Sequence, residues 1–200
     1  MNVENGIIQL NIPNGRLERA VRGLRSVQQR FPLAVARAAN RTMYGMGTDA
    51  ARETSKRYFV KSGDVKKSIE YRKATAGNLM GAMISKGKRH SLADYQLTPS
   101  APKPGGKTQL KGAVKRAGGL KSLKHGFLVR RAGGKYFPFY RIGYDSEHRQ
   151  RGEIRSYISP SMPQIIKNEE IVEAIQQGAE ERFAKRIEAE IFYILEVLPR

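Results

Sequence analysis

The sequence predicts an α+β fold: N-terminal helices, a small antiparallel sheet with a long Pro/Gly/Lys-rich loop, and a long C-terminal helix packed on the sheet. Apolar residues recur at helical spacing near both ends of the chain. Its middle holds short segments of β-branched and aromatic residues between turn signals. The chain has 200 residues, 40% of them hydrophobic, which suits one medium-sized domain. We therefore expect a single domain over residues 1–200, with residues 1–15 as an N-terminal extension.

Two helices are predicted in the first part of the chain. The first covers residues 17–31, after the turn signal Asn14-Gly15. The side of this helix opposite its apolar residues carries Arg16, Arg19, Arg22 and Arg25. We expect these arginines to form either a solvated face or a contact with another subunit. The second helix covers residues 32–58 and has proline at its first position, where no hydrogen bond is lost. Gly45 and Gly47 predict either a bend in this helix or a close packing contact.

Short elements follow in the middle of the chain. Ser62-Gly63-Asp64 predicts a cap for a short helical turn, and residues 91–95 form a short connector. Four strands are predicted as two hairpin-like pairs: residues 69–74 with 79–85, and residues 126–131 with 136–144.

Residues 98–119 are predicted to form a long flexible basic loop or arm. The segment contains three prolines and five glycines and shows no apolar periodicity. We expect it to contact another chain in an assembly and to become ordered there. Its candidate contact residues are Lys103, Lys107, Lys111, Lys115 and Arg116.

The C-terminal helix is predicted over residues 168–198, with Asn168 as its cap. Before it, Pro160-Ser161-Met162-Pro163 predicts irregular structure, because proline disfavours helix interiors and central strands. Pro160, Ser161 and Pro163 are candidate contact residues, as are Phe192 and Tyr193, which lie outside the main apolar face of the helix. That face consists of Ile171, Val172, Ile175, Ala179, Phe183, Ile187, Ile191, Ile194 and Leu195.

Charge is the most pronounced feature of the composition, with 37 basic and 18 acidic residues. Residues 103–155 hold 14 basic and 3 acidic residues, whereas residues 156–200 hold 5 and 8. The excess predicts attraction to nucleic acid first and to acidic protein surfaces second. The asymmetry suggests that the acidic helix of one copy associates with the basic surface of another.

Several classes of function find no support. The chain has no cysteine, which excludes disulfides, a zinc ribbon and a thiol nucleophile. No apolar run approaches the roughly 20 residues of a membrane span, and residues 1–15 lack the layout of a signal peptide. We expect a protein made in the cytoplasm, with no membrane partner.

No residue pattern predicts catalysis, a cofactor or a metal. His90, His125 and His148 have no partner at metal-ligand spacing. Asp145 and Glu147 beside His148 lie among arginines, which favours a solvated loop with local ion pairs, although a hydrolase site is an alternative. Ser161 lacks a strand-to-helix elbow, and the Gly-Gly pairs at 118–119 and 133–134 lack the pattern of a phosphate-binding loop.

Nonspecific DNA binding is the main alternative function. The aromatic residues Tyr136, Phe137, Phe139 and Tyr140 lie near Arg130, Arg131, Lys135 and Arg141 and offer faces for base stacking. Their alternation about Pro138 is more typical of a half-buried strand with an edge proline, so core packing is favoured over stacking.

Several motifs, taken in order, resemble the prophage minor tail protein Z family of long-tailed phages. They are Ala39-Asn40-Arg41-Thr42, the segment from Tyr58-Phe59-Val60 to Lys67-Ser68-Ile69, Ser85-Lys86-Gly87 followed by Ser91-Leu92-Ala93-Asp94-Tyr95, Gly126-Phe127-Leu128-Val129, Arg141-Ile142-Gly143, and Ser159-Pro160-Ser161-Met162-Pro163-Gln164-Ile165. Ser159 stands where the family usually has glycine. The resemblance covers residues 33–198.

The resemblance implies a tail-completion protein without enzymatic activity. Such proteins act at the head-proximal end of the tail, late in assembly, and make it competent to join a filled head. The implied partners are the tail terminator or tube and head–tail connector proteins. The resemblance also implies a homo-oligomeric ring around the DNA channel, located in the virion.

Overall fold

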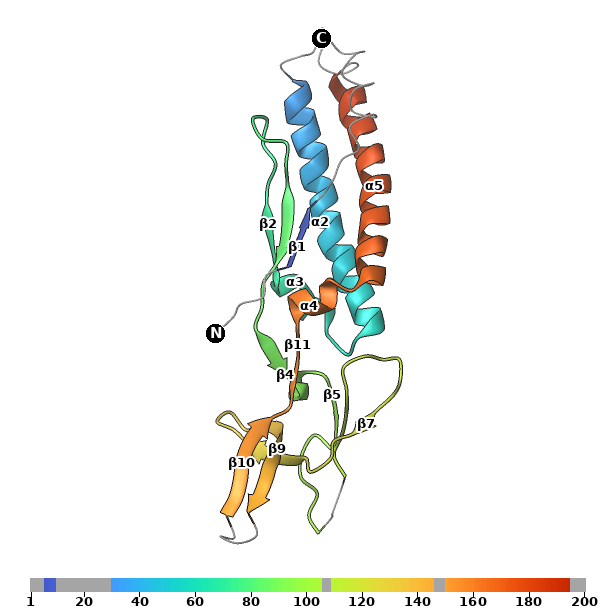
Figure 1. Cartoon of the computed structure of the whole chain (residues 1–200). Coiled ribbons are helices and arrows are strands. Elements are labelled where there is room, and N and C mark those ends of the chain that lie inside the picture. Colours follow the sequence, from blue (N-terminus) through green and yellow to red (C-terminus); the bar gives the residue numbers. More distant parts are fainter. Residues whose placement is uncertain (1–5, 10–29, 106–108, 146–149, 195–200) are drawn as a thin grey trace. The chain divides into compact units, whose positions relative to one another are not determined.

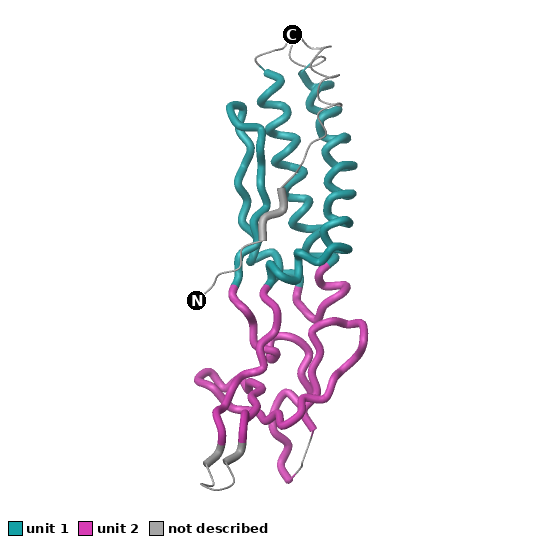
Figure 2. The backbone as a smooth tube through the Cα atoms, in the orientation of Figure 1, with its two compact units in different colours: residues 1–53, 62–87, 162–200 teal, residues 54–61, 88–161 magenta. Residues whose placement is uncertain are grey.

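The computed structural model describes residues 6–9, 30–105, 109–145 and 150–194. The chain forms two compact units, drawn in different colours in Figure 2. Unit 1 comprises residues 1–53, 62–87 and 162–200, and unit 2 comprises residues 54–61 and 88–161. The fold is α+β, as the sequence predicted, with long helices and small antiparallel sheets. That the chain folds as a single domain stays a prediction.

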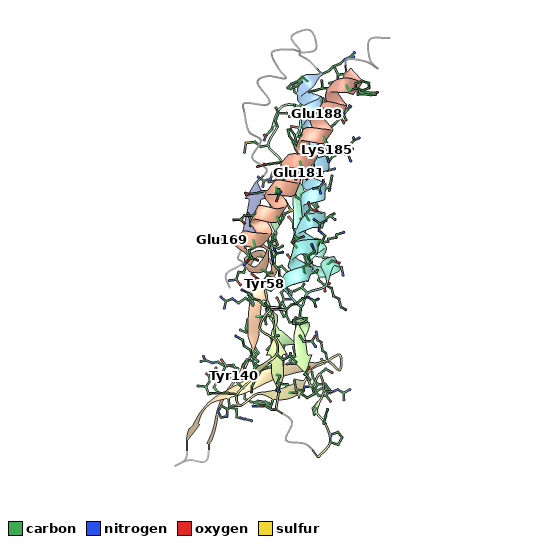
Figure 3. The ribbon with its side chains drawn as sticks, turned by 90° about the vertical axis from the view of Figure 1, so that its right-hand side faces the viewer. Tyr58, Tyr140, Glu169, Glu181, Lys185 and Glu188 are labelled. Carbon is green, nitrogen blue, oxygen red and sulfur yellow. The ribbon has the colours of Figure 1, made fainter. Side chains whose placement is uncertain are left out.

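Two long antiparallel helices form the frame of unit 1. Helix α2 spans Phe31–Arg57 and helix α5 spans Glu169–Phe192, and they lie side by side in Figures 1 and 3. Both confirm helices predicted from apolar periodicity. The first predicted helix and the end of the last one lie mostly outside the described residues. The core between α2, α5 and the β2–β3 hairpin consists of Phe31, Val35, Ala36, Ala38, Ala39, Ala74 and Phe183, with Leu79, Ile187 and Ile191 packed against it.

Glycines allow close packing along both helices. A Cβ at Gly45 would lie 2.4 Å from Nη1 of Arg182, and one at Gly47 would lie 1.8 Å from the hydroxyl of Tyr71. On α5, a Cβ at Gly178 would lie 3.0 Å from Oδ2 of Asp49. The glycines of α2 therefore make room for neighbouring side chains, which is the packing alternative predicted from the sequence.

A three-stranded sheet completes unit 1, together with the short helices α3 (Ser62–Lys67) and α4 (Met162–Ile166). Its strands are β1 (Gly6–Gln9), β2 (Ile69–Arg72) and β3 (Ala82–Ser85), in the order β1-β3-β2. The β2–β3 hairpin is confirmed. Asn40 of α2 holds the hairpin through two hydrogen bonds with the backbone of Ala74, at 2.9 and 2.8 Å.

Unit 2 consists of short antiparallel strands. They are β4 (Arg89–Ser91), β5 (Gln96–Thr98), β6 (Lys111–Ala113), β7 (Lys121–Ser122), β8 (Phe127–Arg130), β9 (Tyr136–Asp145), β10 (Gln150–Ser156) and β11 (Ile158–Ser161), with a 3-10 turn η2 at Leu92–Asp94. They pair as β10-β9-β8, β5-β6-β7 and β11-β4. The β8–β9 pair confirms the second predicted hairpin. Strand β10, which the sequence did not predict, contains no regular apolar alternation.

The structure differs from the predicted loop at residues 98–119, because strand β6 lies within it. Leu110 and Ala113 are buried, with 3% and 7% of their surface exposed. The N–H of Phe59 donates to the carbonyl of Val114 at 2.9 Å. Buried Leu110 and Ala113, together with backbone hydrogen bonds, hold this part of the segment in place. The sequence shows no sign of this, because two isolated apolar residues make no periodic pattern and backbone pairing leaves no trace in residue type.

The prediction of irregular structure at Pro160–Pro163 is wrong. Pro160 lies in β11, at a register shift of a two-stranded sheet, where a missing N–H interrupts no central ladder. Pro163 is the second residue of α4, and the first N–H groups of a helix have no partner within it. Asn168 occupies the position before α5, but its side chain makes no capping hydrogen bond.

Pro138 is not an edge proline, because β9 is the central strand of its sheet. Its carbonyl accepts a hydrogen bond from the N–H of Tyr157 at 3.0 Å, so its nitrogen also faces Tyr157. The carbonyl of Tyr157 accepts instead from the N–H of Leu92, at 3.0 Å. The donor that proline lacks is thus supplied by the η2 turn.

Candidate interaction surfaces

The basic residues predicted as partner contacts are exposed where the structure describes them. Lys103, Lys111, Lys115 and Arg116 are all exposed, and Lys107 lies outside the described residues. Arg116 is held in place within unit 2: its Nε donates to the carbonyl of Ser55 at 2.9 Å, and its guanidinium lies 4.7 Å from the ring of Phe59. Its role in partner contact stays a prediction.

The proline-rich motif mostly serves the interior of the chain. Ser161 and Pro163 are buried, and of the three candidates only Pro160 is exposed. The carbonyl of Pro160 accepts a hydrogen bond from the hydroxyl of Tyr95 at 2.8 Å. Burial, followed by the charge of Asp94 and the nearby Tyr58, raises the pKa of Tyr95 to about 12. A neutral hydroxyl therefore fastens β11 to the η2 turn.

The C-terminal end of α5 exposes apolar surface. Phe192 is 62% exposed and Tyr193 is 44% exposed. These values agree with their predicted position outside the packed face, whose members Ile171 and Ile175 are fully buried. Docking of this end on a neighbouring molecule stays a prediction.

The sheet of β8, β9 and β10 presents a basic-aromatic face. We use this name for Phe127, Phe137 and Phe139 together with the cations Arg131, Lys135 and Arg141. Arg131 lies 5.4 Å from the centroid of the Phe137 ring and 5.9 Å from that of Phe139. Lys135 lies 5.5 Å from the Phe137 ring, and Arg141 lies 5.4 Å from the Phe127 ring. These distances are within the range of favourable cation–π contacts.

Strand register explains why these residues meet. Phe137, Phe139 and Arg141 alternate along β9 and so share one side of the sheet. Phe127 of β8 is the direct partner of Phe139 and a diagonal neighbour of Arg141. The three rings are partly exposed. Phe127 did not stand out in the sequence, although pairing Gly126–Arg131 with Tyr136–Tyr144 about the turn places it opposite this strand.

The other side of this sheet is more closely packed. Pro138 is almost fully buried, and the rings of Tyr140 and Tyr157 lie 4.7 Å apart. Burial, and then the proximity of Tyr140, raises the pKa of Tyr157. The core packing that the sequence favoured for this aromatic strand therefore holds better on this side of the sheet. On the other side, the rings of the basic-aromatic face are partly exposed.

The two units differ sharply in charge. Unit 2 contains 19 Lys and Arg residues against 4 Asp and Glu, whereas unit 1 contains 18 against 14. Among the described residues, neither Arg131 nor Arg141 forms an ion pair, whereas Lys135 pairs with Asp94 at 2.5 Å. Most of the excess positive charge of the chain therefore belongs to unit 2.

The described residues include no cluster of three or more potential metal-ligating side chains. His90 has one acidic neighbour, since its Nδ1 lies 3.6 Å from Oδ2 of Asp94. Glu147 and His148 lie outside the described residues. No described helix is both long and apolar enough to cross a membrane.

These features define a protein whose most distinctive surface presents cations stacked on partly exposed aromatic rings. The family described as prophage minor tail protein Z (GPZ) matches residues 15–200, nearly the whole chain. The chain therefore belongs to the prophage minor tail protein Z family and is a structural protein of a bacteriophage tail. Comparison with curated proteins and with solved structures found no significant match.

Proposed function

We propose that this minor tail protein completes the tail at its head-proximal end and makes the tail competent to join a filled head. The observation that supports this most is family membership over residues 15–200. The proposed partners are the tail terminator or tube on one side and head–tail connector proteins on the other. Copies of the chain form a ring around the DNA channel. The protein acts in the host cytoplasm during assembly and remains in the virion.

Exposed basic residues in unit 2 support this role. A subunit at a junction binds partners on more than one side, and Lys103, Lys111 and Lys115 offer charge that no packed core requires. We propose that the segment of residues 98–119 supplies contacts to a neighbouring chain in the assembled tail.

A phage lacking the gene for this protein tests the proposal. We expect electron microscopy to show tails of normal length beside filled heads that remain unjoined. Adding purified protein to that lysate should restore joined, infectious particles. Normal joining without the protein, or failure to form tails at all, would contradict a role in completion.

The charge of unit 2 also supports a second function, nonspecific DNA binding in packaging or on the phage genome. Binding of this kind weakens steeply with salt, with a slope of about −0.9 per phosphate contact in a plot of log affinity against log salt. A slope steeper than about −3 for duplex DNA supports this function. A slope near zero argues against it.

We propose no catalytic role. Replacing Asp145, Glu147 and His148 together with alanine should leave tail completion and head joining unchanged, because the arginines around them in the sequence favour local ion pairs over acid–base chemistry. Loss of joining by this variant, with the protein still folded, would revive the hydrolase alternative.

A further inference from the structure

We propose that the basic-aromatic face of one copy binds the acidic first half of helix α5 of a second copy. The inference deepens the proposed function, since it identifies a contact that would build the proposed ring. The role of this contact in a ring rests on the proposed function. The contact between two copies does not, because it can be tested with the purified chain alone.

The acidic partner surface is concentrated on one stretch of α5. Residues 169–181 contain five glutamates and no lysine or arginine. Glu169, Glu173, Glu180 and Glu181 are all exposed. Figure 3 shows Glu169 and Glu181 on this stretch of the helix. In the second half of α5, the exposed Lys185 and Arg186 offset the charge of Glu188.

The basic-aromatic face matches this stretch in charge. It presents three cations, and among the described residues only Lys135 of the three has a carboxylate partner. A carboxylate can bind to the edge of a guanidinium that stacks on an aromatic ring, so binding leaves the cation–π contacts intact. The contact would thus join opposite charges without dismantling the face.

The sizes of the two surfaces are also compatible. Twelve residue steps from Glu169 to Glu181 span about 18 Å along a helix. The four steps from Phe137 to Arg141 span about 13 Å along β9, and β8 widens the face by about 5 Å. Val172 and Ala174 lie between the glutamates and are partly exposed, so they can contact the ring edges that the cations leave exposed.

Carboxylates fit this face better than nucleic-acid bases do. Base stacking needs uncovered ring faces, whereas Arg131, Lys135 and Arg141 already lie over all three rings. Stacking would therefore require these cations to leave their rings. Binding of phosphate groups to the same cations is the competing outcome that the experiment must separate.

The contact would be heterologous, because it joins two different surfaces of the same chain. Heterologous contacts generate closed rings when their rotation closes and open filaments when it does not. Its charged character also predicts that salt weakens it.

Sedimentation equilibrium of the purified full-length chain tests the proposal. Self-association should weaken at least about tenfold between 0.1 and 0.5 M NaCl. Two variants should each weaken it at low salt by about tenfold or more: Glu173→Lys with Glu180→Lys and Glu181→Lys, and separately Arg131→Glu with Arg141→Glu. Mixing the two variants should restore association to within about threefold of the wild type. The lysine-bearing helix of one variant then meets the glutamate-bearing face of the other, so opposite charges are paired again.

Lys66→Glu with Lys67→Glu is the matched control. These residues are exposed on α3 of unit 1, and the change in net charge equals that of the arginine pair. The control should leave association within about threefold of the wild type. Circular dichroism checks folding, and Glu→Gln and Arg→Gln versions replace any variant that fails to fold.

A wild-type chain that stays monomeric at low salt up to about 100 µM would overturn the proposal, because a dissociation constant above that value is weak for a protein interface. So would variants that weaken association but do not restore it on mixing. If the arginine variant loses affinity for duplex DNA while self-association is unchanged, the face belongs to nucleic acid instead. None of these results bears on head joining, which the gene-deletion experiment tests separately.

Discussion

The two units of this chain are stabilised in different ways. Unit 1 buries Met43, Met46, Ile171 and Ile175 almost completely between long helices and a sheet. Among the described residues of unit 2, by contrast, Pro138 is one of very few large side chains buried to this degree. Short strands, turns and single hydrogen bonds position the residues of this unit. Unit 2 also holds most of the excess positive charge. The comparison predicts that unit 1 is the more stable of the two units, whereas unit 2 holds most of the basic surface.

The largest expected effect is the cost of a cavity in unit 1. Ile175 is fully buried, so Ile175→Ala should lower the free energy of unfolding by about 3 kcal/mol. In unit 2, Ile154 is 45% exposed, and Ile154→Ala should cost under about 1 kcal/mol. Hydrogen exchange on peptides from each unit measures both. Equal costs would contradict the difference in packing.

The second comparison concerns acidic residues. Asp49 is buried in unit 1, with Oδ2 at 2.9 Å from Nη1 of Arg182 and Oδ1 at 3.2 Å from Arg52. Asp49→Asn leaves Arg182 without its buried counter-charge and should cost about 2 kcal/mol. Asp94→Asn in unit 2 removes a half-exposed pair with Lys135 and should cost about 0.5 kcal/mol. Urea denaturation of both variants checks the order, and a larger cost for Asp94→Asn would reverse it.

A third effect concerns the hydroxyl of Tyr95. Its pKa is about 12 in the folded chain and near 10 when unfolded, so the folded state favours the neutral form. The stability it contributes is complete below pH 10 and is lost as the pH rises from 10 to 12. Tyr95→Phe should cost about 1 kcal/mol at pH 7, through the lost hydrogen bond to Pro160, and should weaken this alkaline loss of stability. Hydrogen exchange in unit 2 across this pH range is the measurement, and an identical profile in the variant would refute the role.

The smallest expected effect is a difference in salt response. Raising NaCl from 0.05 to 0.5 M screens repulsion among the cations of unit 2 and should stabilise it by up to about 1 kcal/mol. Unit 1, with nearly balanced charge, should change by less. Hydrogen exchange of each unit at both salt concentrations measures this, with monomer concentration kept low to exclude self-association. A larger gain in unit 1 would contradict the charge comparison.

The sequence predicted unit 1 better than unit 2, and the same physical difference explains why. A long buried helix leaves a periodic apolar stripe, so α2 and the packed face of α5 could be recognised from residue spacing. Strand β6, with three residues, is too short to leave such a stripe, and the described side chains of β10 are exposed or only partly buried. The place of Pro138 in a central strand depends on one hydrogen bond from Leu92, which no local pattern reveals.

The candidate surfaces were predictable in composition but not in arrangement. Lysine and arginine counts indicated the basic region, and Arg131, Lys135 and Arg141 were noted beside the aromatic residues. Their stacking on Phe127, Phe137 and Phe139 depends on strand register, which hairpin spacing alone did not determine. Ser161 is buried in strand β11 and Pro163 in helix α4, two regular elements that the prolines of this segment argued against.

Quantitative mass spectrometry of nuclease-treated, salt-washed virions and isolated tails tests the central claim most directly. If the chain is a structural subunit at the head-proximal end of the tail, it should be present in both at one fixed copy number. That number should match other ring proteins of the same tail. Absence from washed particles, with abundant protein in the infected-cell lysate, would contradict a structural place in the tail and indicate a transient assembly factor or a DNA-binding protein.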